Sequence, residues 1–360
     1  MTFSAMRFAS VSFPPPRFLA LPIAGVDLST SGVKTVTLRD TWNGLELASF
    51  GNRFIPTGSV TGGEVMDRTK VIEAVRMLTK EKGITVANFG LPESKSYLFQ
   101  TNVPDGPEEE IRTALEQRID EFIPLQPADT AFDFVVLGRS EGQARVAGVG
   151  YARRFIMEML SICEEAGVTV RAAEPETCSI ARALLPHGDT STVLIVDIGK
   201  ATTKLTVVAH RVPLFATTFD VGGHALTLAV QKYFGVTEEG ARKIKAERGI
   251  LSAGGNEEYL AAMLSTASVI REEIGRRLEY WQTHARASGA EPVVRAVLAG
   301  GNASVRGLPE YLETALKIPV ELGDVFTNLA SRDAYLPPVD YQESLAYATA
   351  IGLALREYVL

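Results

Sequence analysis

Hydrophobic residues dominate or recur in two short stretches near the start of the chain, IAGVDL (23–28) and VKTVTL (33–38), and polar residues separate them. This pattern predicts two strands joined by a tight turn, with a third strand near 45–55. Apolar residues then recur at helical spacing over 65–82, and a short apolar run follows at 84–91. We therefore expect an amphipathic helix leading into a buried strand.

The next part of the chain has a different order of elements, β-α-β-β-α. The pattern predicts a strand at 96–103, a helix at 107–122, strands at 131–138 and 143–150, and a helix at 151–167. Pro107 and three glutamates open the first of these helices, where the positive end of the helix dipole favours them. We expect residues 92–167 to form a compact unit inserted into a larger fold.

Strands and helices continue to alternate after this unit, which predicts an α/β fold with mixed sheets. The expected elements are a strand and a helix within 168–186, a hairpin over 193–208, strands at 213–220 and 294–299, and helices at 222–234, 237–248, 256–286, 308–316 and 342–358. The longest helix has one apolar stripe, made by Ile270, Ile274, Leu278 and Trp281.

Two hairpins of this pattern match each other residue by residue. GVDLSTSGVKTVTL (25–38) aligns with VDIGKATTKLTVV (196–208), so that Asp27 matches Asp197 and Lys34 matches Lys204. Any single hairpin can look like either stretch. Two matched copies, with their aspartates 170 positions apart, instead favour two related half-folds that each present one turn to a shared cleft.

The residues of these turns suit a nucleotide. A turn rich in Gly, Ser and Thr exposes consecutive backbone N–H groups that bind phosphate oxygens, and its small side chains let the backbone approach closely. The hydroxyls of Ser29, Ser31, Thr202 and Thr203 add donors. Mg²⁺ arrives with phosphates and keeps several waters, so Asp27 and Asp197 are placed to hold it through water, while Lys34 offsets phosphate charge.

A third stretch, AVLAGGNASVRGL (296–308), combines a buried strand with adjacent glycines. Gly300 and Gly301 allow a flat ring to lie on bare backbone, although a flexible strand-to-helix loop would have the same composition.

Composition limits the other possibilities. The formal charge of −7 argues against a protein that holds nucleic acid. Cys163 and Cys178 fall in predicted helices, without a Cys-x-x-Cys motif, and suit buried thiols in a reducing cytosol. The four histidines never reach the spacing of a metal site.

No apolar run reaches the roughly 20 residues of a membrane span. Pro14–Pro16 interrupt the mildly apolar start, so we expect an extended N-terminal arm and not a signal peptide.

The three motifs, in this order and spacing, resemble those of the actin-like ATPase superfamily, which includes actin, Hsp70, sugar kinases and the cell-division protein FtsA. Asp27–Lys34 resemble its first phosphate motif, Asp197–Thr203 its second and Ala299–Ala303 its adenosine motif. Residues 173–184 and 344–357 resemble its two connecting helices. The resemblance implies a two-lobed fold with duplicated ribonuclease-H-like halves that binds ATP and Mg²⁺. Gly352 in the second connecting helix would permit close helix packing at the hinge.

Within the superfamily the chain resembles most the PilM family of type IV pilus assembly proteins. Four stretches carry this: the inserted unit, which implies a 1C-type subdomain, and residues 213–230, 237–249 and 302–322. The resemblance implies that Glu239, Lys243 and Lys245 face the ribose.

The implied nucleotide-binding set is Asp27, Ser29, Ser31, Lys34, Gly199, Lys200, Ala201, Thr202, Thr203, Gly222, Gly223, Glu239, Lys243, Lys245, Gly300, Gly301, Asn302 and Ala303, with Asp27 and Asp197 holding Mg²⁺ through water. Glu174 either orients a catalytic water or is only the carboxylate of a helix start. Ser29, Lys200 and Lys204 depart from the superfamily pattern, and Lys200 either contacts phosphate or points to solvent. Despite these departures we expect the chain to bind nucleotide. We expect its ATPase activity to be weak or absent.

The resemblance also implies a division into subdomains. These are a first lobe (1–91, 168–190 and 343–360), the insert (92–167), a second-lobe base (191–218 and 291–342) and a helical second-lobe part (219–290).

We expect an ATP-binding scaffold in the cytoplasm, peripheral to the inner membrane through a partner. The expected partner is the cytoplasmic tail of a PilN-like inner-membrane protein. Other pilus machinery as further partners, and an oligomeric state, remain alternatives. The alternatives are a slow ATPase or small-molecule kinase of the same fold, or an FtsA-like filament-forming division protein.

Overall fold

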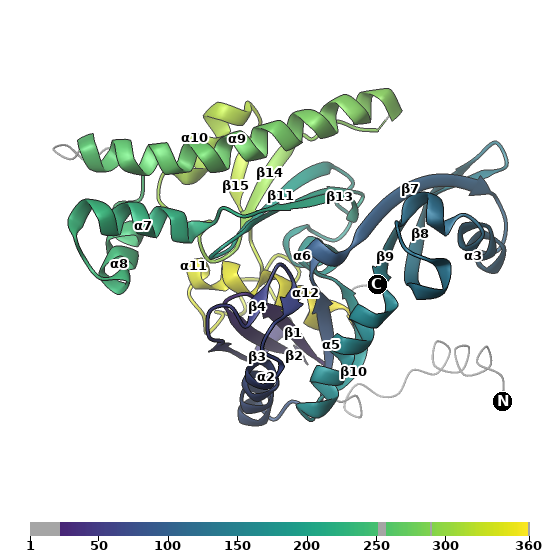
Figure 1. The fold of residues 1–360 in the computed structure, drawn as a ribbon, viewed down its shortest axis with the longest axis horizontal. Helices are drawn as coiled ribbons and strands as arrows, with labels where there is room; N and C mark the ends of the chain where they lie inside the picture. Colours follow the sequence, from purple (N-terminus) through teal and green to yellow (C-terminus); the bar gives the residue numbers. More distant parts are fainter. Residues whose placement is uncertain (1–21, 251–256, 289, 359–360) are drawn as a thin grey trace.

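The computed structural model describes residues 22–250, 257–288 and 290–358, so the expected N-terminal arm lies outside the described residues. Two five-stranded sheets form two lobes, and a smaller three-stranded sheet projects from one side of them (Figure 1).

The sheet of the first lobe combines an antiparallel meander with two parallel strands. In sheet order, its strands are β10 (Thr169–Pro175), β6 (Val86–Leu91), β1 (Ala24–Ser29), β2 (Gly32–Thr41) and β3 (Gly44–Phe54). β1, β2 and β3 are antiparallel, whereas β6 and β10 run parallel to β1. The predicted strands at 23–28, 33–38, 45–55 and 84–91 are confirmed.

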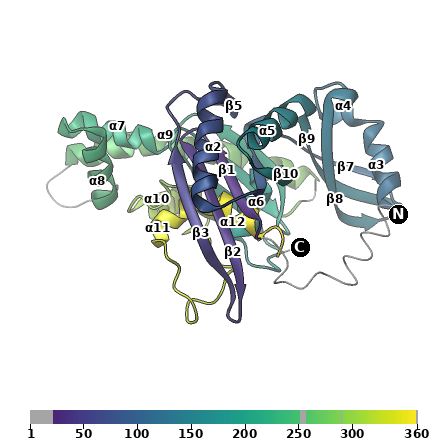
Figure 2. The same cartoon turned by 90° about the horizontal axis from the view of Figure 1, so that it is seen from below.

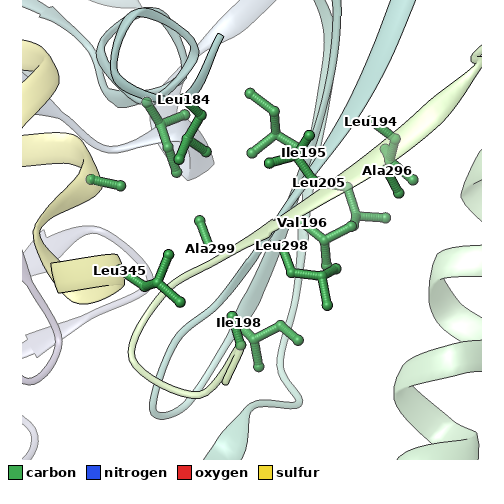
Figure 3. Close-up of a cluster of buried hydrophobic side chains, with 14 of the residues drawn as sticks. Leu184, Leu194, Ile195, Val196, Ile198, Leu205, Ala296, Leu298, Ala299 and Leu345 are labelled. Atoms are coloured by element: carbon green, nitrogen blue, oxygen red, sulfur yellow. The ribbon is translucent and has the colours of Figure 1, made fainter. Parts of the chain in front are cut away.

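The sheet of the second lobe repeats this plan. Its strands are β15 (Val320–Leu322), β14 (Arg295–Ala299), β11 (Thr192–Ile198), β12 (Thr203–Ala209) and β13 (Val212–Phe219). Here too a three-stranded meander precedes two parallel strands, and its core packs as Figure 3 shows around Ile195, Val196 and Leu298. The expected duplication of half-folds is confirmed.

Two helices lie between the sheets, α6 (Glu176–Leu184) and α12 (Ala348–Leu355). A Cβ atom at Gly352 would come 1.8 Å from the carbonyl oxygen of Ser179, so the two helices can cross this closely only at a glycine. The predicted close packing at Gly352 is confirmed.

The last predicted helix, 342–358, is broken into α11 (Tyr341–Ser344), η4 (Leu345–Tyr347) and α12. The carbonyl oxygen of Leu345 accepts a hydrogen bond from the amide of Gly300, a contact with a distant loop that replaces the regular helical pattern.

The inserted unit has its own sheet and its own core. Its strands are ordered β7 (Tyr97–Pro104), β9 (Gln143–Ala152) and β8 (Thr130–Ser140), and they pack against α3 (Glu108–Glu116) and α4 (Ile119–Phe122). Short turns of 3₁₀ helix, η2 (Glu93–Lys95) and η3 (Pro127–Asp129), precede β7 and β8. The helix predicted over 107–122 is two helices, because Arg118 leaves the helical conformation at φ −126° and ψ 13°.

Helix α5 (Arg153–Glu165) joins the core of the first lobe, and at its first residue it also contacts the insert, where Arg153 donates to the carbonyls of Ala128 and Thr130. Phe155, Met159 and Ile162 share one buried cluster with α2 (Arg68–Lys82), and Figure 2 shows the two helices side by side. The apolar stripe of α5 thus contributes to the core of the first lobe.

The start of the predicted helix 65–82 is also different. A small hairpin, β4 (Val60–Thr61) and β5 (Glu64–Val65), precedes α2, and Asp67 caps the helix by accepting a hydrogen bond from the amide of Lys70.

Four further helices belong to the second lobe. They are α7 (Gly223–Phe234), α8 (Glu238–Arg248), α9 (Glu257–Ser288) and α10 (Leu308–Leu316). α9 extends across the top of the lobe in Figure 1, and its predicted apolar stripe is buried. In the part of the chain that the structure describes, no helix combines the length and the apolar character needed to cross a bilayer.

Candidate functional site

A cavity of about 1090 Å³ lies between the two lobes and is lined by both matched hairpins. The loop after β14, one face of α7 and α8, the start of α6 and residues of the segments 52–63 and 345–349 also contribute to its wall. The predicted residues that line it are Asp27, Ser29, Ser31, Lys34, Asp197, Gly199, Lys200, Thr202, Gly223, Lys245, Gly300, Gly301 and Asn302. The structure therefore brings together most of the set expected at a nucleotide site.

Six residues of the predicted nucleotide-binding set do not line this cavity. Thr203, Gly222 and Ala303 are buried behind its wall, where Thr203 donates to the carbonyl of Val221 at 2.7 Å, and Ala201 is exposed. Glu239 and Lys243 form an exposed ion pair of 3.0 Å on the outer side of α8. Arg242 and Lys245, three positions apart on the opposite side of the helix, face the cavity instead.

The turns themselves are tight and held by their own polar groups. Ser29 Oγ donates to the carbonyl of Gly32 at 3.1 Å and lies 3.1 Å from Ser31 Oγ. In the second turn, the amide of Gly199 donates to the carbonyl of Thr202 at 2.9 Å. Both turns thus present short backbone segments to the cavity, as a phosphate site requires.

A buried polar network joins the adenosine-type loop to α7 and α8. Asn302 Nδ2 donates to the carbonyl of Gly199 at 2.9 Å, and Lys245 Nζ donates to Asn302 Oδ1 at 2.7 Å. Lys245 also donates to the carbonyl of Gly223 and to Thr227 Oγ1, both at 3.0 Å. Burial, and to a lesser extent the nearby Arg242 guanidinium, lowers the pKa of Lys245 to about 8. The Asn302 side chain fits here because residue 223 is a glycine. A Cβ atom at that position would lie only 1.9 Å from the Asn302 side chain.

The floor of the cavity carries opposite charges in close contact. Lys34 Nζ lies 3.8 Å from Asp27 Oδ2, and Lys204 Nζ donates to Glu176 Oε2 at 2.6 Å. Burial raises the pKa values of Asp27 and Asp197, and the two lysines oppose this rise.

Sequence reasoning did not assign Lys204 and Glu176 to the site. Lys204 could have been found, because the repeat aligns it with Lys34.

The structure does not bring Glu174 to the cavity. Its carboxylate is buried and pairs with Arg182 at 2.5 Å and with Arg356 at 2.6 Å. Glu176, two residues later at the start of α6, lines the cavity in its place. The expectation that Glu174 orients a water therefore does not fit this geometry, because two arginines already neutralise it at a distance from the cavity.

The rim on the second lobe is basic, and of its residues sequence reasoning had named Lys200 but not His224 or Arg242. Glu238 Oε1 lies 3.8 Å from Lys200 Nζ and 3.9 Å from His224 Nδ1, and it pairs with Arg242. Lys200, His224 and Arg242 line the cavity. An anion that enters the cavity at this rim meets the side chains of Lys200, His224 and Arg242, all of which lie close to the carboxylate of Glu238.

The residues present fit ATP with Mg²⁺. Buried carboxylates from opposite lobes, with raised pKa values, gain from a nearby cation. Within the described ranges, no three His, Cys, Asp or Glu side chains gather as a metal site of their own. A metal would therefore need oxygen ligands from phosphate and water, which is how Mg²⁺ usually binds. The cavity is also large enough for a nucleotide, since ligand sites span about 300–1,000 Å³.

A second cavity, of about 660 Å³, lies where the insert meets the start of α5. Its lining is Asp120, Ile123, Pro124, Leu125, Gln126, Asp129, Ala152 and Arg154. It combines apolar side chains with charges of both signs.

Two duplicated half-folds that present matched Asp–Lys hairpins to one cavity define the class of two-lobed, actin-like ATPase folds. Solved structures agree with this class. A PilM–PilN type IV pilus biogenesis complex is similar with a TM-score of 0.76 and 22% identity, over 95% of this chain and 99% of that one. The ethanolamine utilization protein EutJ from Carboxydothermus hydrogenoformans has a TM-score of 0.53 and 17% identity, over 95% and 90% of the two chains. MreB5 of Spiroplasma citri bound to ADP has a TM-score of 0.53 and 14% identity, over 87% and 94%.

The chain belongs to the family of the type IV pilus assembly protein PilM, whose model matches residues 25–358.

Proposed function

We propose that this PilM-family protein is an ATP-binding scaffold that couples closure of its lobes to binding of an inner-membrane partner. The observation that carries the proposal is the convergence of Asp27 and Asp197, from matched hairpins of different lobes, on one cavity. A ligand that contacts both hairpins favours the closed arrangement, which is a hinge-type change. The ADP bound to MreB5, which shares the fold, supports a nucleotide as that ligand.

In this proposal the phosphates lie against the turns at Ser29–Ser31 and Gly199–Thr202, and the base lies on Gly300 and Gly301. Asp27 and Asp197 would hold Mg²⁺ through water, and the metal would supply positive charge to the phosphates. On α8 the expected Lys245 faces the cavity, and Arg242 faces it in place of Glu239 and Lys243. Hydrolysis is slow, because the lining carboxylate of Glu176 is paired with Lys204 and is not free to act on a water.

The partner in this proposal is the cytoplasmic tail of a PilN-like protein, which holds the scaffold under the inner membrane. The PilM–PilN complex, which has the same fold, supports this choice. We place the tail in the second cavity, where Ile123 and Leu125 offer apolar contacts and Arg154 offers a charge. Peptide grooves commonly combine apolar pockets with a few polar groups of this kind.

We retain the expected subdomains with one change. The first lobe takes α5, whose buried side chains join its core, and the insert spans the segment from η2 to β9.

Calorimetric titration tests both halves of the proposal. ATP with Mg²⁺ is titrated into the wild-type protein, into Asp27→Ala and Asp197→Ala, and into Asp333→Ala, an exposed control. We expect binding to the wild type and the control and a loss of at least about tenfold in the two site variants. Equal binding by all four proteins would contradict the nucleotide site.

The tail peptide of the neighbouring PilN-like protein is then titrated into the wild-type protein and Leu125→Asp. Leu125 is half-buried in the second cavity, so a buried charge there should weaken tail binding and leave ATP binding unchanged. If the peptide binds both proteins equally, it docks elsewhere.

A further inference from the structure

Three polar residues lie side by side across the second sheet. Asp197 of β11 is opposite Lys204 of β12, and Lys204 is opposite Thr218 of β13. Residues directly opposite in antiparallel ladders project from the same face of a sheet, and all three line the cavity between the lobes. A row of side chains therefore connects the aspartate proposed for Mg²⁺ with the edge strand β13.

This row contacts the other two parts of the molecule, and its contacts meet at Glu93. Thr218 donates to the carboxylate of Glu93, which lies in η2 at the start of the insert. Lys204 donates to Glu176 Oε2 at 2.6 Å, and Glu176 Oε1 accepts from the amide of Glu93, also at 2.6 Å. Because Glu176 belongs to α6, Glu93 joins the insert to both lobes.

The insert also lies against β13 along its first strand. β13 contacts η2, β7 and β9, and Figure 1 shows β7 beside it. Gln100 of β7 donates from Nε2 to the carbonyl of Leu214 in β13 at 3.3 Å. A displacement of the second lobe is therefore transmitted to the insert at two points, Glu93 and Gln100.

The second cavity lies where the insert meets the first lobe. Its lining from Asp120 to Asp129 belongs to the insert, whereas Arg154 belongs to α5, whose core contacts are those of the first lobe. The shape of this cavity therefore depends on the position of the insert relative to α5. Glu93 lines neither cavity, so it can act only by positioning the insert.

We propose that the row Asp197–Lys204–Thr218 acts through Glu93, so that ATP in the first cavity changes the shape of the second. This inference rests on the proposed function and names the residues that couple its two sites. A ligand that contacts both hairpins changes the angle between the lobes, and Thr218 moves with the second sheet. Glu93 and Gln100 then displace the insert relative to α5. By linkage, the tail changes the affinity for ATP by the same factor.

The first test titrates the tail peptide of the neighbouring PilN-like protein with and without saturating ATP and Mg²⁺. The principal variant is Glu93→Leu with Gln100→Ala, which removes both polar contacts with β13 and fills the buried position with an apolar side chain. Gln100→Ala alone, at an exposed position, is the second variant if the double change impairs folding. Glu116→Leu with Gln117→Ala makes the same changes at exposed positions near the end of α3 and is the matched control.

We expect ATP to change the dissociation constant of the tail at least about fivefold in the wild type and the control. In the double variant the change should fall below about twofold, although ATP and the tail each still bind, and Gln100→Ala should lie between. Equal coupling in the double variant overturns the inference, as does a wild type without coupling. Both outcomes leave the two sites of the proposed function intact.

The second test does not need the tail. Spin labels on cysteines at Glu109 of the insert and Glu73 of α2, both exposed, report the position of the insert relative to the first lobe. Burial raises the pKa of Cys163 and of Cys178 to about 12, so these thiols react slowly with the label.

We expect ATP with Mg²⁺ to shift the distance between the labels in the wild type and to leave it unchanged in the double variant. A wild-type insert that stays in place while ATP binds overturns the inference. A tail that fails to bind overturns the tail site alone, and the label distances then decide the inference. Absence of ATP binding overturns the nucleotide site and this inference together.

Discussion

The carboxylate of Glu93 accepts a hydrogen bond from the hydroxyl of Thr218, which joins the start of the insert to β13 of the second lobe. The amide of Glu93 donates to Glu176 Oε1 at 2.6 Å, and Glu176 in turn accepts from Lys204. A continuous chain of polar contacts therefore connects the cavity floor with the segment that leads into the insert. These polar contacts join the second lobe to the first lobe at Glu176–Lys204 and to the insert at Glu93–Thr218, so both contacts change if the second lobe moves.

Thr218→Val removes the donor to Glu93, which is only 6% exposed. Leaving a buried acceptor without its donor costs about 1–3 kcal/mol, so we expect the free energy of unfolding to fall by that amount in denaturant titrations. Thr218→Ser keeps the hydroxyl and should stay close to the wild type. If both variants lose equal stability, the cause is packing at this position and the hydrogen bond has no role.

Asp197→Asn should stabilise the ligand-free protein at pH 7, because burial raises the pKa of Asp197 and its charged form is unfavourable in the fold. A folded pKa above the unfolded value, about 3.9, means that the protonated carboxyl contributes stability below that pH. This contribution is lost as the pH rises through the folded pKa.

The gain from Asp197→Asn should therefore shrink as the pH is lowered from 7 into the range where the wild-type carboxyl takes up its proton. Thermal unfolding of both proteins across this range measures the difference. A gain that does not change with pH would show that Asp197 is not the titrating group.

Gly352→Ala should destabilise the protein by several kcal/mol, because its Cβ would lie 1.8 Å from the carbonyl oxygen of Ser179 and would force α6 and α12 apart. Gly275→Ala in α9 is the matched control. The Cβ there meets only Leu316, at 3.9 Å, so this helical substitution should stabilise by about 0.5–1 kcal/mol. Denaturant unfolding of the two variants should give changes of opposite sign.

ATP binding should weaken as the pH rises through about 8, the pKa to which burial lowers Lys245. Above that pH the amine loses the charge that attracts phosphate. Lys245→Met should bind more weakly at pH 7 and show no further weakening between pH 7 and 9, measured by calorimetry. Lys243→Met, on the outer side of α8, should keep the wild-type pH dependence. If Lys243→Met abolished the pH dependence of ATP binding, Lys245 would not be the titrating group responsible.

Local patterns along the chain were sufficient for the two halves of the fold and for the heart of the site. Strand periodicity and the matched Asp–Lys spacing depend only on neighbours in sequence, and the ladders place Asp27 opposite Lys34 and Asp197 opposite Lys204 as the repeat implied. The turn chemistry at Ser29 and Gly199 is local in the same sense. The amino-acid sequence by itself therefore points to these residues, and it also carries the resemblance that the family match supports.

Contacts between distant segments decided the rest. Glu174 and Glu176 are two residues apart, and only the positions of Arg182, Arg356 and Lys204 determine that the second one faces the cavity. The cavity-facing side of α8 is set by Asn302, 57 positions after Lys245, to which Lys245 donates. The apolar stripe of α5 could have packed on the insert as well as on α2. The sequence of a helix shows that it has an apolar face. It does not show which surface packs against that face, because folding brings that surface there from a distant part of the chain.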